Sequence, residues 1–299
     1  VSHENPLARG PGETRLFTDT AWFGPANAET VLLNISGTHG AEGYGGSAVQ
    51  TAWIGEGGPA ALPRDVAVLM VHALNPFGFA WGLRGTENNV DLNRNFLDHT
   101  RPYPENPLYA ALHDTLCPAT LDDDAIQKML AGGARFIERH GQWALEDAMS
   151  RGQYTHADPK SPQFARAAQW WGRTTLDPKT VDAMWGSKRP TRNGILFWGI
   201  EDMLGQHTQL SGAVIEFRSA QVKTNAGRAM RVPMLERWLR FVGGFDAPEA
   251  AGYFEEIRDD YAPRRASWRE NVIANGLSCY EQTIAGLGEW AREGLKAAD

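Results

Sequence analysis

The stretch that decides the fold is Val31-Leu-Leu-Asn-Ile-Ser-Gly-Thr-His-Gly-Ala-Glu-Gly-Tyr-Gly-Gly46. Residues 30–35 are mostly apolar and uncharged, so they are predicted to form a buried strand. A glycine-rich turn follows, and residues 41–54 can form a helix that begins on this turn. A second buried strand is predicted over 65–72, and it ends at the turn signal Leu74-Asn-Pro-Phe-Gly78.

Other segments extend the same alternation of strands and helices. An edge strand or hairpin is predicted over 14–23, and further strands over 194–199 and 211–217. Helices are predicted over 107–116, 122–150 (broken at Gly132-Gly133), 162–172, 230–243 and 271–296, and a polar loop over 88–96. Because strands alternate with helices, we expect an α/β fold: one domain over 1–299, with a mixed, mostly parallel twisted sheet flanked by helices.

Composition excludes several classes of protein. The 299 residues are 42% hydrophobic and 22% charged, with a formal net charge of −7, which is ordinary for a globular protein. Lysine and arginine do not cluster, so no nucleic-acid partner is expected. No apolar run reaches the roughly 18 residues of a membrane helix, so no membrane partner is expected.

The two cysteines, Cys117 and Cys279, are too few and too far apart for a disulfide framework or a metal knuckle. Two ordinary buried thiols in a reducing compartment are the expectation, and therefore a cytoplasmic location. The chain begins Val-Ser-His-Glu without a methionine, so its N-terminus is expected to be incomplete, and a removed signal peptide stays open.

Polar clusters follow or end three of the predicted strands, where sites form in α/β sheets. His39 and Glu42 form the first, and zinc accepts both histidine nitrogen and carboxylate oxygen. We interpret the glycines around them as letting the backbone approach a ligand closely. Alone, such a pair is more often an ordinary turn.

The second cluster contains Arg84 and the segment Asn88-Asn-Val-Asp-Leu-Asn-Arg-Asn-Phe96. Guanidinium groups bind carboxylates and polarise carbonyls, although turn-forming polar residues and an arginine paired with a nearby acid explain the cluster equally well. The third is Glu216 in Ala213-Val-Ile-Glu-Phe217. A glutamate in an apolar strand needs a partner: it is either a general base or half of a buried ion pair.

Together these clusters resemble the zinc carboxypeptidases, the carboxypeptidase A-like metallopeptidases, and most closely their bacterial carboxypeptidase-like branch. The resemblance covers most of residues 14–295 and depends on four matches in order. They are Gly37-Thr-His-Gly-Ala-Glu-Gly43, Asn75-Pro-Phe-Gly78 followed by Arg84, Asn89-Val-Asp-Leu-Asn-Arg-Asn-Phe96, and the strand that carries Glu216.

The resemblance implies a role for each matched residue. His39 and Glu42 would be zinc ligands, and Arg84 would polarise the scissile carbonyl and stabilise the oxyanion. The terminal carboxylate of the substrate would be held by Asn93 and Arg94. Glu216 would act as the general base and then as the acid, with water activated by zinc.

The third zinc ligand of these enzymes has no counterpart in the expected place. That histidine would follow residues 152–156 and precede Trp170-Trp171, but the two elements are almost adjacent. Three explanations stay open: a segment is missing near 158–161, His156 substitutes, or the ligand has been lost. A further departure is Arg218 after Glu216, which bears on substrate specificity.

We therefore expect a zinc-dependent hydrolase of amide or peptide bonds, a metallocarboxypeptidase-like protease acting on small peptides. An N-acyl amino-acid deacylase of the aspartoacylase type is the alternative, and a non-catalytic relative that binds an anion or peptide is another. The tryptophans at 170, 171, 185 and 198 could line a pocket, although core packing explains them as well. Oligomeric state and substrate side chain stay open.

Overall fold

The computed structural model describes residues 1–88, 90–94, 102–116, 122–150, 243–262 and 265–293, and the positions 118, 120, 235, 236, 238 and 239. They fall into two compact units. The first contains residues 1–83 and the described residues after 253, and the second contains those from 84 to 253. The domain bounds 1–299 stay a prediction.

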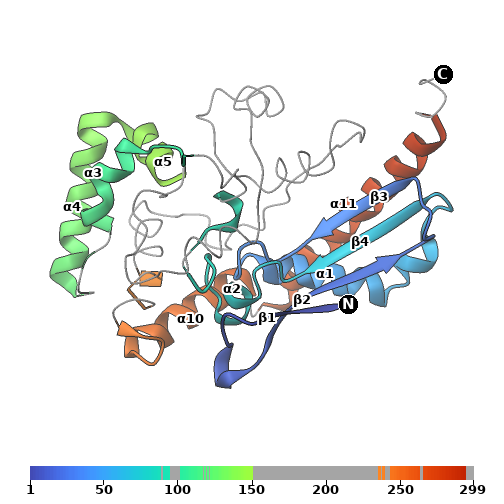
Figure 1. Ribbon diagram of the computed structural model, residues 1–299, viewed down its shortest axis with the longest axis horizontal. Coiled ribbons are helices and arrows are strands. Elements are labelled where there is room, and N and C mark those ends of the chain that lie inside the picture. The colour runs from blue at the N-terminus through green and yellow to red at the C-terminus, as the bar shows by residue number, and fades with distance from the viewer. Residues whose placement is uncertain are drawn as a thin grey trace. The chain divides into compact units, whose positions relative to one another are not determined.

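The first unit contains a mixed sheet with the order β1-β2-β4-β3 (Figure 1). Its strands are β1 (Ser2–Asn5), β2 (Leu16–Phe23), β3 (Thr30–Ile35) and β4 (Val66–His72). β2 pairs antiparallel with β1 and β4, whereas β3 and β4 run parallel. The predicted mixed α/β class is confirmed, and both buried strands form within one residue of their predicted bounds. The expected mostly parallel order does not hold in the described sheet, where β3–β4 is the parallel pairing and the other two are antiparallel. β2 is not the edge, because β1 pairs with its outer side.

Two helices pack against this sheet and against each other, α1 (Gly43–Gly55) and the long α11 (Ala266–Glu293) (Figure 1). Apolar side chains from both helices and from β4 form a common core, namely Trp53, Val68, Met70, Tyr280 and Ile284. The Trp53 and Tyr280 rings meet edge to face at 5.1 Å. This core fixes α1, and with it the turn that carries His39 and Glu42.

The second unit contains a helical cluster of α3 (Pro107–Leu116), α4 (Asp123–His140) and α5 (Gln142–Ser150). The predicted break at Gly132-Gly133 is wrong, because α4 continues through both glycines. A Cβ at Gly132 would lie 2.5 Å from Thr115 Cγ2, so this glycine allows α3 and α4 to approach closely. The break occurs at Gly141 instead, where φ is +85°.

Several other elements differ from those predicted, and some predicted elements fall on residues that the structure does not describe. Helix α2 (Pro76–Trp81) starts within the predicted turn, and α10 (Pro248–Tyr261) was not predicted. Short 3-10 turns occur at η1 (Pro11–Glu13), η2 (Gly58–Ala61) and η3 (Leu92–Arg94). The predicted strands 194–199 and 211–217 and helix 162–172 lie outside the described residues. Among the described helices, none is long and apolar enough to cross a membrane.

Candidate functional site

The turn that carries His39 and Glu42 begins where β3 ends, beside the end of its parallel neighbour β4. Backbone hydrogen bonds continue past both strands, from Leu74 N to Ser36 O (3.0 Å) and from Asn75 N to Gly37 O (2.8 Å). Ala73, which lies between the last residue of β4 and Leu74, has a left-handed φ of +51°, which is uncommon for a residue with a side chain. The two loops therefore form one hydrogen-bonded layer at the carboxyl edge of the parallel strands, as expected for a site in an α/β sheet.

The glycines of this turn are required by contacts between backbone segments. Gly37 has a φ of +70°, and its added Cβ would lie 2.8 Å from the Cα of Ala73. A Cβ at Gly40 would lie 1.9 Å from Gly78 O, and one at Gly43 would lie 2.5 Å from Gly37 Cα. Close packing of the chain on itself thus accounts for these glycines, which we had interpreted as room for a ligand.

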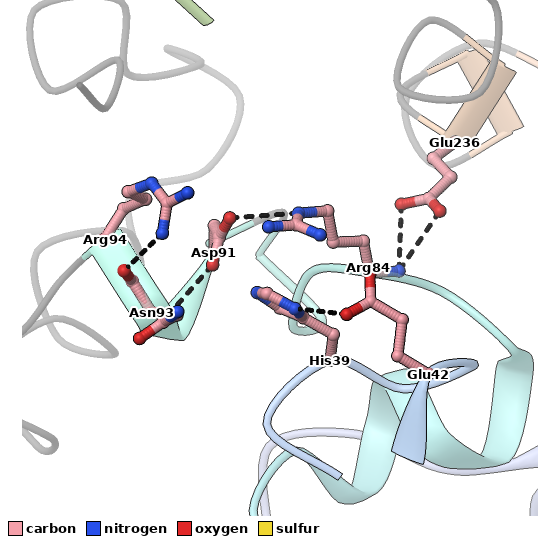
Figure 2. A network of polar contacts seen from close by, with 7 residues as sticks. All are labelled: His39, Glu42, Arg84, Asp91, Asn93, Arg94 and Glu236. Atoms are coloured by element: carbon pink, nitrogen blue, oxygen red, sulfur yellow. Dashed lines mark hydrogen bonds and ion pairs between the residues drawn. The ribbon is translucent and has the colours of Figure 1, made fainter. Parts of the chain in front are cut away.

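His39 and Glu42 point toward each other, as predicted (Figure 2). His39 Nδ1 lies 3.0 Å from Glu42 Oε2. The imidazole is 10% exposed and the carboxylate 35% exposed. Glu42 is the N-cap residue of α1, but its side chain makes no capping hydrogen bond and turns to His39 instead. The helix start therefore orients the carboxylate toward the imidazole.

This donor pair fits two positions of a zinc site. Two ligands at about 2.0–2.1 Å from a tetrahedral zinc are roughly 3.3 Å apart, close to the observed separation of Nδ1 and Oε2. The two atoms are also within hydrogen-bonding distance of each other. Among the described residues, no group of three histidine, cysteine, aspartate or glutamate side chains is arranged to hold a metal.

A second polar group lies behind the turn. Ser36 Oγ lies 2.8 Å from Gln50 Oε1 and 3.3 Å from His72 Nδ1. Gln50 Nε2 donates to Asn34 Oδ1 at 2.7 Å and to Val71 O at 3.1 Å. Ser36 and Gln50 are buried. These contacts join β3, β4 and α1 directly beneath the turn.

The Arg84 side chain, which belongs to the second unit, is held by an acid of its own loop. Arg84 Nε donates to Asp91 Oδ2 at 3.0 Å, and Asp91 Oδ1 accepts from Asn93 N at 2.9 Å (Figure 2). The Arg84 side chain is 38% exposed, so the pair is open to solvent. The pairing of an arginine with a nearby acid, left open from the sequence, is present.

Asn93 and Arg94 lie together in η3. Arg94 Nη1 donates to the Asn93 carbonyl at 2.8 Å, and Arg94 N donates to Asp91 O at 3.0 Å. Arg94 is buried, with 9% of the residue exposed. Because the turn is closed by its own hydrogen bonds, the guanidinium is held in one place rather than on a flexible loop.

A buried carboxylate far along the chain holds the backbone at Arg84. Both oxygens of Glu236 accept from Arg84 N, each at 3.1 Å (Figure 2). Tyr253 OH donates to Glu236 Oε1. Sequence reasoning missed Glu236, and it did not name Asp91 as the acid that pairs with Arg84. An acid among the apolar residues Met234, Leu235, Trp238 and Leu239 of the predicted helix 230–243 was the available signal for Glu236, and the quoted Asn89–Phe96 motif contained Asp91.

Some predicted site residues lie outside the described residues, and their roles stay predictions. The general base Glu216, its neighbour Arg218 and the substitute ligand His156 are in this group. So are Cys117 and the tryptophans at 170, 171, 185 and 198. Cys279 is a free, partly buried thiol on α11.

Comparison with known proteins identifies a family. The family model described as "Protein of unknown function (DUF2817)" matches residues 1–161 and 156–275. The two matches overlap over residues 156–161. No curated protein matches the chain. The chain belongs to the DUF2817 family.

Proposed function

Family membership assigns no activity to this chain, and we propose that it is a zinc-dependent hydrolase of amide bonds that acts as a carboxypeptidase. The single observation that carries the proposal is the convergence of His39 Nδ1 and Glu42 Oε2 at 3.0 Å. The pair is mostly shielded from solvent on the imidazole side and lies at the carboxyl edge of a parallel strand pair. A histidine nitrogen and a carboxylate oxygen at this separation match the ligand chemistry of zinc.

The arginines supply the second part of the proposal. Arg84 would polarise the substrate carbonyl, and Asp91 would orient its guanidinium through Nε. Preorganised donors of this kind contribute about 3–4 kcal/mol to transition-state stabilisation. Asn93 and Arg94 would bind the terminal carboxylate of a peptide, since guanidinium and amide groups donate to carboxylate oxygens.

Proton transfer is assigned to Glu216. His39 and Glu42, with a third ligand, would hold the zinc, whose chemistry would be to polarise a water and lower its pKa. Glu216 would act as the general base and then as the acid that protonates the leaving amine. Replacing Glu216 by glutamine should therefore abolish turnover while zinc content stays near one per chain.

Zinc stoichiometry tests the proposal directly. The purified chain should contain about one zinc per molecule by elemental analysis, measured alongside its intact mass. His39→Ala and Glu42→Gln should each lower the bound zinc by tenfold or more at a fixed free zinc concentration. His140→Ala is a matched control, because His140 lies at the exposed end of α4. Equal zinc content in all four proteins would refute the assigned ligands.

A substrate panel separates the candidate reactions. Peptides with a free C-terminal carboxylate should be cleaved, and the same peptides with an amidated C-terminus should be cleaved much more slowly. The Arg94→Ala protein should likewise cleave the free peptides at a small part of the original rate. Cleavage of N-acyl amino acids alone would favour the deacylase. Zinc-free protein that binds peptides without cleaving them would favour the non-catalytic relative.

A further inference from the structure

The polar group behind the turn has a hydrogen-bond pattern that can be followed atom by atom. A carbonyl oxygen only accepts, so the contact with Val71 O identifies the Gln50 atom there as the donating nitrogen. Gln50 Oε1 therefore faces Ser36 and accepts its hydroxyl proton at 2.8 Å. A hydroxyl has one proton, so Ser36 Oγ must accept from His72 Nδ1, which lies 3.3 Å away.

This pattern sets which ring nitrogen of His72 carries a proton. The ring carries its proton on Nδ1, and a neutral ring then has an unprotonated Nε2. Burial lowers the pKa of His72 below its usual 6.5, although the charge of Asp19, its cross-strand neighbour, acts in the opposite direction. The Phe79 ring meets the imidazole edge to face at 5.0 Å. His72 is therefore a neutral donor to Ser36 near pH 7.

The group connects the supports of both proposed ligands. Gln50 is on α1, the helix whose N-cap is Glu42. Ser36 is the first residue after β3 and leads into the turn that carries His39. A Cβ added at Gly46 would lie 3.2 Å from the Cβ of Ser36, so the first turns of α1 pass close to Ser36. A change in this hydrogen-bond chain would move α1 and the turn relative to each other.

We propose that His72, Ser36 and Gln50 are positioning residues that hold His39 and Glu42 at the separation needed to bind zinc. The inference rests on the proposed function, because it concerns the same two ligands. The three side chains bond to one another and to Val71 O, and they act through the backbone of β3, β4 and α1. Partners that bond a metal ligand directly change metal affinity by about 10–100-fold when replaced, and for these residues, which act one step further away, we expect the lower end of that range.

Two substitutions of His72 separate positioning from bulk packing. The side-chain amide nitrogen of asparagine is as many bonds from Cα as Nδ1 of histidine, so His72→Asn keeps a donor opposite Ser36. The amide of glutamine corresponds to Nε2, so His72→Gln removes that donor while keeping a polar side chain of similar size. His72→Asn should keep zinc affinity within threefold of the unchanged protein, whereas His72→Gln should lower it by about tenfold or more.

Zinc affinity is measured by competition with a chromophoric chelator at a temperature where circular dichroism shows each variant to be folded. Ser36→Ala is a second test, since it removes the oxygen that both Gln50 and His72 contact. Its loss of zinc affinity should match that of His72→Gln. Thr51→Ala is the control: Thr51 is exposed on α1, and its hydroxyl donates to Ser47 O within the same helix. Its zinc affinity should not change.

The outcomes distinguish the two proposals. If the unchanged protein binds no zinc, the proposed function fails and the positioning role fails with it. If it binds zinc and both His72→Gln and Ser36→Ala bind equally well, the positioning role alone is refuted. A tautomer measurement by ¹⁵N NMR of the metal-free protein adds a test without zinc: a proton on Nε2 rather than Nδ1 of neutral His72 would also overturn it.

Discussion

Replacing Gly40 by alanine tests whether contacts between backbone segments shape the His39 turn. Gly40 N donates to Leu83 O at 3.0 Å, and Leu83 N donates to Gly78 O at 2.8 Å. An added Cβ at Gly40 would lie 1.9 Å from Gly78 O and 2.4 Å from Leu83 O. Three backbone segments meet at this point, and none can move away by a side-chain rotation.

The expected loss of stability follows from that geometry. Real Cβ contacts essentially never fall below 3.0 Å, so the Gly78 carbonyl must move by at least about 1.1 Å. Overpacking usually costs about 1–3 kcal/mol, and rigid backbone places this site at the upper end. We expect Gly40→Ala to lower the free energy of unfolding by about 3 kcal/mol. Because Gly40 follows His39 directly, zinc affinity should fall as well.

Urea unfolding, followed by circular dichroism, measures the difference in the free energy of unfolding between Gly40→Ala and the unchanged protein. Gly55→Ala is the matched control, because Gly55 ends α1 and an added Cβ there meets nothing within 4 Å. Alanine is the better helix former, so this variant should be unchanged or more stable by about 0.5–1 kcal/mol. A Gly40→Ala protein as stable as Gly55→Ala would refute the account of the glycine-rich turn.

Three further predictions concern other contacts. Hydrogen bonds from Arg15, and to a lesser extent from Arg9, lower the pKa of Glu4 from the usual 4.5 to about 2. The stability that this pair contributes is therefore present above pH 4.5 and disappears as the pH falls toward 2. In Arg15→Ala, the pKa of Glu4 measured by NMR titration should return toward 4.5. Tyr280→Phe should raise the free energy of unfolding, measured in urea, by up to about 1 kcal/mol. The buried hydroxyl has no hydrogen-bond partner in the described part of the chain, and phenylalanine keeps the contact of the ring with Trp53. A clear loss of stability would contradict this. Asp91→Ala should lower the free energy of unfolding by about 1–2 kcal/mol, because both the Arg84 and the Asn93 N contacts are lost. Asp91→Asn should lower it by less, because asparagine can still accept from Asn93 N. Equal losses in urea unfolding would show that the contact with Asn93 N contributes nothing.

Local sequence patterns predicted much of the first unit. The strands at 30–35 and 65–72 and the helix after the glycine turn appear within two residues of their predicted bounds. Apolar runs bounded by turn signals are local properties, and burial in a sheet reinforces them. The His39–Glu42 contact was also predictable, because residues three apart at a helix start are close whatever the rest of the chain does.

Glycine was misread twice, for one physical reason. At Gly132 it was taken for a helix break, and at Gly40 for space left for a ligand. In both places the missing Cβ lets another part of the chain approach, Thr115 in one case and Gly78 in the other. Whether a glycine serves a turn, a ligand or close packing depends on what lies opposite, and that partner is distant in sequence.

The sequence by itself therefore determined the strand–turn–helix unit, its mixed α/β class and the pairing of an imidazole with a carboxylate. Tertiary structure alone decided the contacts between distant polar groups within each unit: Ser36, Gln50 and His72 beneath the turn in the first, and Glu236 at the backbone of Arg84, 152 residues away, in the second. Side-chain periodicity encodes which face of an element is buried, but hydrogen bonds between distant polar groups leave no periodic pattern. They are defined only when the elements have packed.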